Sequence, residues 1–150
     1  MRVTVETLLP VPPDVAWPRL LAWEEQARWM RDADEVRVLT RRREGVGVRV
    51  AVRTRVLNVP VFTDQLEVTV WDPPRRLVMA HRSPVRGVGE WRLDAAGPGA
   101  RFRWTEELSL PPPVLGELAL RAYRPFLRHV MGGAVAELRE LLERPGSSPA

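Results

Sequence analysis

The stretch VRVAVRTRV, residues 48–56, decides the fold class. Valine or threonine occupies every second position, and the positions between them carry Arg49, Ala51, Arg53 and Arg55. A period of two residues is typical of a β-strand with one face in the core and the other in solvent. The stretch therefore predicts a half-buried strand and not a helix.

Similar runs lie on both sides of this stretch, separated by Gly, Pro and Asp turn residues. Strands are expected at residues 2–9, 35–43, 48–56, 62–71, 76–83, 87–94 and 101–110. Two short helices are expected within residues 14–30, and one long helix over 114–143. Two glycines in the sixth run indicate a bulge. Pro125 and the pair Gly132-Gly133 predict a kink or loosening of the long helix.

This order predicts an α+β fold with a curved, antiparallel, seven-stranded sheet. Because one face of the sheet is apolar, something must cover it, and the C-terminal helix is the one predicted element long enough to do so. The space between a curved sheet and such a helix is a natural ligand site. We expect a single domain over residues 1–144, followed by a disordered tail over 145–150.

Composition narrows the function classes for this chain of 150 residues. The net charge is +4, but Lys and Ile are both absent, which favours a GC-rich coding bias over selection for nucleic-acid binding. Cysteine is absent too, so disulfides and thiolate chemistry are excluded. The sequence has no phosphate loop, nucleophile elbow or metal-ligand spacing. Without a signal segment or an apolar run of about 18 residues, the chain is expected to be cytoplasmic, with no integral membrane segment.

Four stretches carry a family resemblance: VPPDVAWPRLLAWEEQARWM (11–30), WDPPRRLVMAHRS (71–83), GEWRLDAAGPGARFRWTEEL (89–108) and YRPFLRHVMGGAVAELRELLE (123–143). They resemble the START/Bet v 1-like (SRPBCC) superfamily, in particular bacterial polyketide cyclase/dehydrase-like proteins. The resemblance implies the helix-grip fold, in which the sheet wraps around the C-terminal helix. It also implies a hydrophobic cavity that takes a lipid, polyketide or quinone-like molecule without a cofactor.

Asp64, Glu106 and His81 are the candidate catalytic residues. Each falls in the apolar half of an alternating strand. A carboxylate buried without a partner shifts its pKa upward, which makes a general acid or base available near neutral pH. The alternative is a position at a strand end, or beyond a bulge that reverses the alternation, and either would place these side chains in solvent.

Aromatic and apolar side chains form a second set. The candidate ligand-binding residues are Trp29, Trp91, Trp104, Tyr123, Phe126, Val52, Leu66 and Met79. Aromatic rings suit a flat apolar ligand, although each of them could equally belong to the core. Trp17, Trp23 and Trp71 are expected nearer the periphery.

Two further polar residues are weaker functional candidates. A solvated edge is the default for Arg42. Because it shares its strand parity with Val38 and Thr40, the alternative is that it pairs with a cavity carboxylate or an acidic ligand group. His129 is expected at the solvent edge of the long helix. No metal site is expected.

Three functions stay open on this reasoning. The first is binding of a hydrophobic or aromatic small molecule by a carrier or sensor, as a monomer or homodimer. The second is a polyketide cyclase/aromatase-type enzyme that uses cavity carboxylates or His as acid and base. The third is a protein-interaction module. A large cavity with a desolvated carboxylate or His favours the enzyme, apolar walls alone favour the carrier, and a filled cavity with an exposed apolar patch favours the module.

Overall fold

The computed structural model describes residues 1–56, 59–83 and 85–144, and the expected tail at 145–150 lies outside them. Its elements are β1 (Arg2–Leu9), α1 (Pro13–Leu20), the 3-10 helix η1 (Trp23–Arg28), β2 (Ala33–Val38), β3 (Arg49–Val56), β4 (Val59–Asp72), β5 (Arg76–Ser83), β6 (Arg86–Ala96), β7 (Gly99–Ser109) and α2 (Pro113–Glu143).

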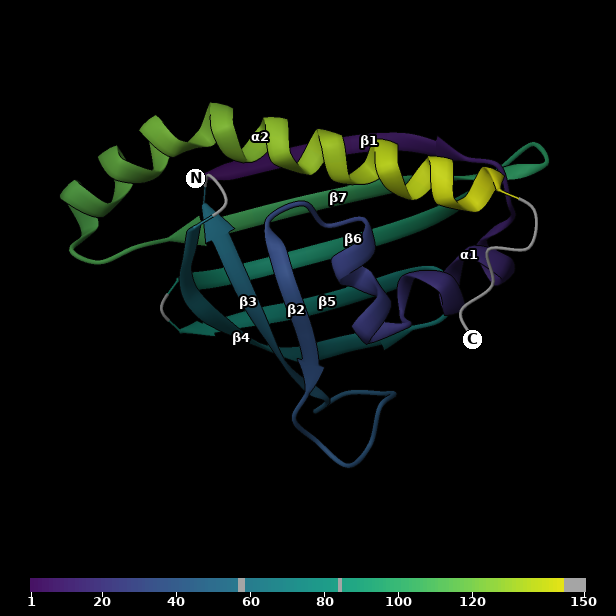
Figure 1. The fold of residues 1–150 in the computed structure, drawn as a ribbon, viewed down its shortest axis with the longest axis horizontal. Helices are drawn as coiled ribbons and strands as arrows, with labels where there is room; N and C mark the ends of the chain where they lie inside the picture. The colour runs from purple at the N-terminus through teal and green to yellow at the C-terminus, as the bar shows by residue number, and fades with distance from the viewer. Residues whose placement is uncertain (57–58, 84, 145–150) are drawn as a thin grey trace.

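The seven strands form one antiparallel sheet in the order β1-β7-β6-β5-β4-β3-β2. Register shifts in the β2–β3, β3–β4 and β4–β5 pairs bend this half of the sheet, as bulges do. Figure 1 shows the result: β2 and β3 cross steeply in front of β5 and β6, while α2 runs along β1 and β7. The predicted seven-stranded sheet with its long C-terminal helix, the helix-grip arrangement, is confirmed.

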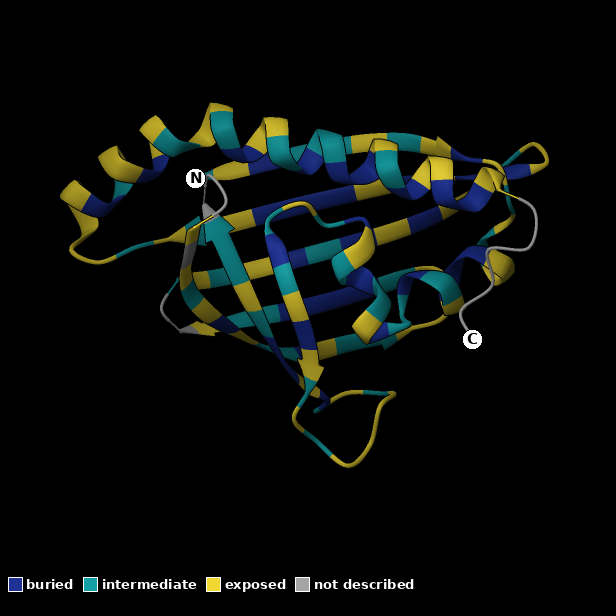
Figure 2. Cartoon of the chain, viewed as in Figure 1, coloured by how far each residue is buried: buried dark blue, intermediate teal, exposed yellow. Residues whose placement is uncertain are grey.

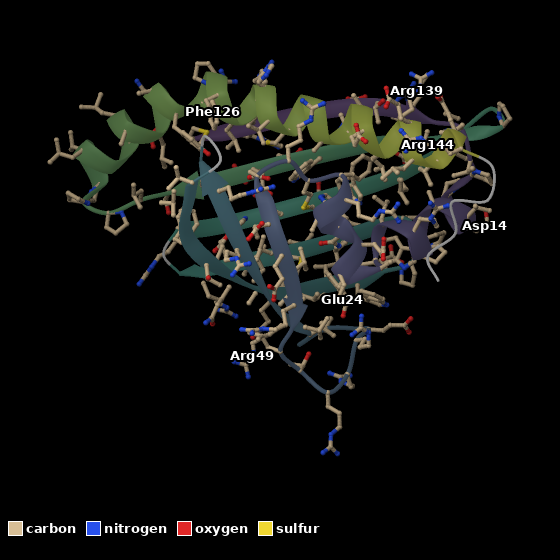
Figure 3. All side chains as sticks on the ribbon, viewed as in Figure 1. Asp14, Glu24, Arg49, Phe126, Arg139 and Arg144 are labelled. Atoms are coloured by element: carbon tan, nitrogen blue, oxygen red, sulfur yellow. The ribbon has the colours of Figure 1, made fainter. Side chains whose placement is uncertain are left out.

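Alternation separates the two faces of the sheet as predicted. Val48 and Val50 are each 1% exposed, whereas the intervening Arg49 lies on the solvent side (Figure 3). Buried and exposed positions alternate along most strands in Figure 2. The arginines therefore mark the outside of the protein, away from the apolar face.

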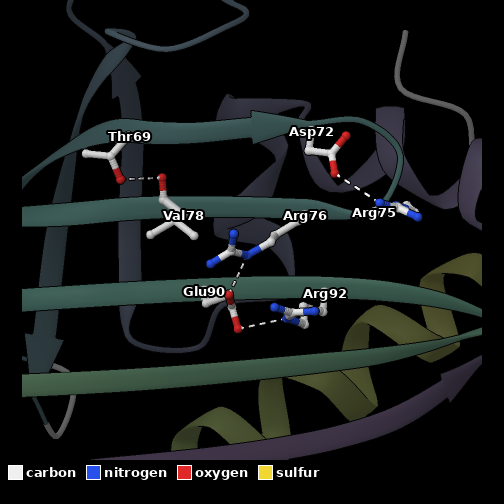
Figure 4. A network of polar contacts seen from close by, with 7 residues as sticks. All are labelled: Thr69, Asp72, Arg75, Arg76, Val78, Glu90 and Arg92. Atoms are coloured by element: carbon white, nitrogen blue, oxygen red, sulfur yellow. Dashed lines mark hydrogen bonds and ion pairs between the residues drawn. The ribbon is translucent and has the colours of Figure 1, made fainter.

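An ion-pair network covers the outer face of β5 and β6 (Figure 4). Glu90 accepts hydrogen bonds from Arg76 Nε at 2.6 Å and from Arg92 Nε at 3.1 Å. Beside it, Thr69 Oγ1 donates to the carbonyl of Val78, and Asp72 pairs with Arg75 across a turn. Ion pairs at a protein surface contribute little stability, about 0–1 kcal/mol each.

α1 and η1 close one end of the curved sheet. The expectation that Trp17 and Trp23 are peripheral is wrong, because both helices pack inward and leave these rings 9% and 1% exposed. The Trp23 indole donates to the carbonyl of Arg43 at 2.8 Å. Trp17 stands edge-on to the partly buried Trp71, with 5.4 Å between ring centroids.

The strand expected at 35–43 ends at Val38, and a loop follows up to β3. Gly45 and Gly47 adopt left-handed φ values of 95° and 96°, which turn the chain back before β3. The Arg42 guanidinium donates to the carbonyl of Val46 at 2.8 Å within this exposed loop. Arg42 therefore lies in solvent, as its default interpretation has it, and not on the cavity face.

The helix α2 continues through Pro125 and Gly132-Gly133, although Figure 1 shows its axis bending in the first half. Its first turns extend past the sheet (Figure 2), so Leu115 and Leu118 are 67% and 57% exposed despite their apolar character. The later turns bury their inner side, and Arg139 on the outer side pairs with Glu143. Within the described chain, no helix combines the length and apolar character that crossing a membrane requires.

Candidate functional site

A histidine held between two carboxylates forms the polar centre of the site. His81 on β5 contacts Asp64 Oδ2 on β4 through Nδ1 at 2.7 Å, and Glu106 Oε2 on β7 through Nε2 at 2.8 Å. Asp64 and Glu106 are 8% and 9% exposed, and the His81 side chain is 10% exposed. The three candidate catalytic side chains therefore face the interior and touch one another. We call them the Asp64–His81–Glu106 cluster.

A glycine on the intervening strand leaves room for this cluster. β6 lies between β5 and β7, and Gly89 pairs in register with Met79 on one side and Glu106 on the other. A Cβ at Gly89 would lie 2.9 Å from Glu106 Oε1 and 3.0 Å from Oε2. The expected bulge at the glycines of β6 is wrong, because the register runs through them without a shift. Gly89 instead makes space for a carboxylate.

Gly89→Ala tests this account of the glycine. The added methyl group is expected to displace the Glu106 carboxylate from His81, which lowers the pKa of His81. The free energy of unfolding is expected to fall by about 1–3 kcal/mol. NMR titration of the His81 ring and urea unfolding measure the two effects. Gly132→Ala is the matched control, since among the described residues its added Cβ has no atom within 4 Å apart from its own stretch of helix. An unchanged His81 titration in Gly89→Ala would contradict the prediction.

The two carboxylates of the cluster differ in their remaining contacts. Glu106 Oε1 accepts a hydrogen bond from the Trp104 indole at 2.8 Å, so both of its oxygens are occupied. Asp64 Oδ1 is buried without a hydrogen-bond partner among the described residues. Glu106 is thus held through both of its oxygens, whereas Asp64 can still accept a hydrogen bond at Oδ1.

Burial and hydrogen bonding act in opposite directions on the charge of His81. Desolvation disfavours the imidazolium, but the hydrogen bonds to Asp64 and Glu106 and the charges of these carboxylates outweigh it and raise the pKa of His81 to about 10. For Asp64, burial dominates and raises its pKa above the ordinary aspartate value, against the hydrogen bond and charge of His81. His81 is therefore a cation at neutral pH, and Asp64 accepts a proton more readily than an exposed aspartate.

The hydrogen-bond geometry also fixes the proton count of the cluster. Contacts at both ring nitrogens require two protons shared among three groups, which leaves one net negative charge. Moving a proton from His81 Nδ1 to Asp64 along the 2.7 Å contact does not change that total. The cluster can therefore relocate a proton without creating new buried charge.

The cluster borders a cavity of about 110 Å³. Its lining consists of Gln26, Met30, Asp32, Ala33, Val50, Val52, Thr54, Asp64, Leu66, Leu77, Met79, His81, Gly89, Trp91, Trp104 and Glu106. For scale, a dry cavity of about 150 Å³ binds benzene in an engineered protein. The cavity therefore suits a group near the size of one six-membered ring.

The structure separates the candidate ligand-binding residues into two groups. Five of them, Val52, Leu66, Met79, Trp91 and Trp104, line the cavity. Trp29 packs behind the wall, with ring centroids 5.6 Å from Trp91 and 6.3 Å from Trp104. Tyr123 and Phe126 contact each other on the first half of α2 and do not belong to this lining as the described residues form it (Figure 3).

Sequence reasoning missed Asp32 as a cavity residue. It precedes β2 directly and reads as the turn out of the short helices, so no alternation marked it. Burial raises the pKa of Asp32, and the charges of Glu106 and Asp64 add to this effect. Burial, together with the charge of Asp32, also raises the pKa of Tyr123. The cavity is thus more acidic than the two predicted carboxylates alone would make it.

Three other observations complete the site. Among the described residues, no group of three or more His, Asp or Glu side chains is placed to hold a metal ion. His81 has both ring nitrogens engaged by carboxylates. His129, as expected, is exposed on α2.

Comparison with solved structures finds the same fold in several proteins. Protein TTHA0849 from Thermus thermophilus is 20% identical over 95% of this chain and 97% of its own, with a TM-score of 0.77. The Zhui aromatase/cyclase from Streptomyces sp. R1128 is 17% identical over 97% and 98%, with a TM-score of 0.71. The di-domain ARO/CYC StfQ from the steffimycin biosynthetic pathway is 15% identical over 95% of this chain and 50% of its own, with a TM-score of 0.74.

At these identities the likeness shows the fold alone. No curated protein matches the chain. A family model described as polyketide cyclase / dehydrase and lipid transport matches residues 1–143, nearly the whole chain. The chain therefore belongs to the polyketide cyclase/dehydrase and lipid transport family.

Proposed function

We propose that the protein binds a ring-sized apolar group in the cavity and transfers protons on it, as a cyclase- or dehydrase-type enzyme. Family membership and the likeness to aromatase/cyclases support a ligand-binding or cyclase role. The observation that favours an enzyme over a carrier is that His81 is hydrogen-bonded to both Asp64 and Glu106 at the cavity wall. Buried ionisable groups with perturbed pKa values beside a cavity are typical of acid–base sites.

The apolar wall and the cluster have separate roles in this proposal. The rings of Trp91 and Trp104 hold a flat group by burying its faces. Asp64 takes a proton from a carbon next to a ligand carbonyl, and the imidazolium of His81 stabilises the carboxylate between turnovers. In a dehydration, the cluster returns one proton to the departing hydroxide, so that water leaves and no net proton is gained or lost.

The cavity volume limits which part of a ligand reacts there. About 110 Å³ accommodates a single ring and not an extended polyketide chain. A longer ligand therefore places its reacting ring beside the cluster and leaves the rest outside the cavity. Holding the reacting carbons next to a fixed base lowers the barrier by orientation as well as by proton transfer.

A carrier role is the second candidate, and the apolar wall formed by Val50, Leu77 and Met79 favours it. A carrier needs that wall but gains nothing from a buried charged cluster, whose desolvation costs several kcal/mol per ion. The interaction module has weaker support. Val114, Leu115 and Leu118 are exposed on α2, but the cavity is not filled as that function requires.

The test uses a ring-sized β-hydroxyketone, 3-hydroxycyclohexanone, whose dehydration to the enone is followed by ultraviolet absorbance. The wild-type protein is expected to accelerate it, and Asp64→Asn to lose about 100-fold of that acceleration while still binding the ring. Glu90→Gln removes a carboxylate on the outer face and is expected to keep the wild-type rate. Binding of the ring without any acceleration by the wild type would contradict the enzymatic proposal and favour a carrier.

A further inference from the structure

The charged groups that line the cavity are unbalanced in sign. Three carboxyl side chains, Asp32, Asp64 and Glu106, face one imidazole, that of His81. No arginine is among the lining residues in the described chain, although the sequence has 23 basic residues. With His81 charged, ionised carboxyl groups leave the lining negative. A second negative charge brought in by a ligand would meet repulsion in a medium of low polarity.

The hydrogen-bond donors of the cluster are already engaged. Both ring nitrogens of His81 contact carboxylates, and the Trp104 indole donates to Glu106. In contrast, Asp64 Oδ1 is a buried acceptor that has no partner among the described residues. A buried acceptor left without a hydrogen bond is unfavourable, so a ligand donor that reaches Asp64 Oδ1 binds more tightly than a ligand without one. The cluster is therefore suited to accept hydrogen bonds and poorly suited to donate them.

The basic side chain whose charge affects Asp32 does not correct this imbalance. Arg55 lies close enough for its charge to affect Asp32, but its guanidinium is held at 3.7 Å by Asp34, outside the cavity lining. No ion pair joins Asp32 to a basic side chain in the described chain. The pKa of Asp32 is raised by burial and by the charges of Glu106 and Asp64, as expected where additional negative charge is unfavourable.

The geometry points to a ligand that carries a hydrogen-bond donor and no negative charge. Its donor, a hydroxyl or an ammonium group on a ring, meets the carboxylate side of the cavity, and its apolar face meets Trp91 and Trp104. Fatty acids and other carboxylates are excluded by the same charges. This inference rests on the proposed binding of a ring-sized group in the cavity and adds its chemical class.

Four matched ring compounds test the inference on the 150-residue chain at pH 7: phenol, anisole, benzoate and benzylammonium. Binding is followed by the fluorescence of the cavity tryptophans and by calorimetry. Phenol is expected to bind more tightly than anisole, which lacks the donor, and at least about tenfold more tightly than benzoate. Phenol supplies a hydroxyl donor and benzylammonium an ammonium donor, so the two compounds show which donor the cavity prefers. Tighter binding of either compound than of anisole supports the inference.

Two variants locate the selectivity. Asp64→Asn is expected to reduce the preference for phenol over benzoate by about tenfold. Asp32→Asn leaves the cluster intact and is expected to reduce the same preference, because it also removes a carboxylate from the lining. Glu90→Gln, on the outer face, is expected to leave the preference unchanged. Benzoate binding as tightly as phenol, with anisole also bound, would overturn the inference alone. Failure of all four compounds to bind would overturn the proposed function as well.

Discussion

His81→Leu is expected to lower the free energy of unfolding at pH 7 by about 3–5 kcal/mol, because it leaves two buried carboxylates without their shared counter-charge. Leucine fills a similar volume, so the loss measures electrostatics and not a cavity. Both partners contact the imidazole within 2.8 Å, and all three side chains are about nine-tenths buried. The loss is expected to shrink toward pH 4, where protonation removes the uncompensated charge. Urea unfolding at pH 7 and pH 4 measures both values.

The chain supplies its own control for this substitution. His129 is exposed on α2, so His129→Leu is expected to change the free energy of unfolding by at most about 0.5 kcal/mol. Equal effects of the two substitutions would contradict the account of the cluster. A loss in His81→Leu that did not depend on pH would point to packing and not to charge.

Stability is expected to fall as the pH rises from about 6.5 to about 10. The pKa of His81 is raised from 6.5 to about 10 in the folded protein, so the folded state holds this proton more tightly. The stabilisation is complete below the unfolded value and is lost as the pH rises through the folded value. This difference between the folded and unfolded pKa values of His81 corresponds to a loss of free energy of unfolding on the order of 4 kcal/mol between pH 6.5 and pH 10. The raised pKa values of Asp64 and Asp32 act in the same direction at lower pH.

The composition makes this pH range easy to interpret. The chain has no Lys and no Cys, so few side chains other than His81 can change charge within this pH range. The pKa of Tyr123 is raised, which moves its titration upward and out of the range. Urea unfolding at pH 6, 8 and 10 measures the slope, and His81→Leu is expected to lose most of it. Constant or rising stability over this range in the wild type would contradict the prediction.

The alternation of the strands is sufficient to place Asp64, Glu106 and His81 inside. It cannot show that they touch, because the contacts join β4, β5 and β7 and pass over a strand whose glycine leaves the space. Strand pairing over long sequence distances, not local pattern, brings these groups together. In the sequence, Gly89 looks like a bulge position. The sequence alone does not show that a neighbouring strand places a carboxylate where the side chain of residue 89 would lie.

At other positions the tertiary context, and not the local pattern, decides where a side chain lies. Leu115 and Leu118 have the spacing of a buried helix face, but no sheet lies beneath that end of α2. Arg42 would share a face with Val38 if β2 continued to it, but β2 ends at Val38. Asp32 lies in a turn, where periodicity carries no information, and only the closed fold places it at the cavity.

The most direct test of the central claim is an NMR pH titration of the His81 ring. The chain has two histidines, so exposed His129 serves as an internal reference in the same spectrum. His81 is expected to remain an imidazolium through pH 8 and to titrate near pH 10, far above the ordinary value of 6.5. A His81 ring that loses its proton at or below pH 6.5 would contradict a charged cluster between Asp64 and Glu106.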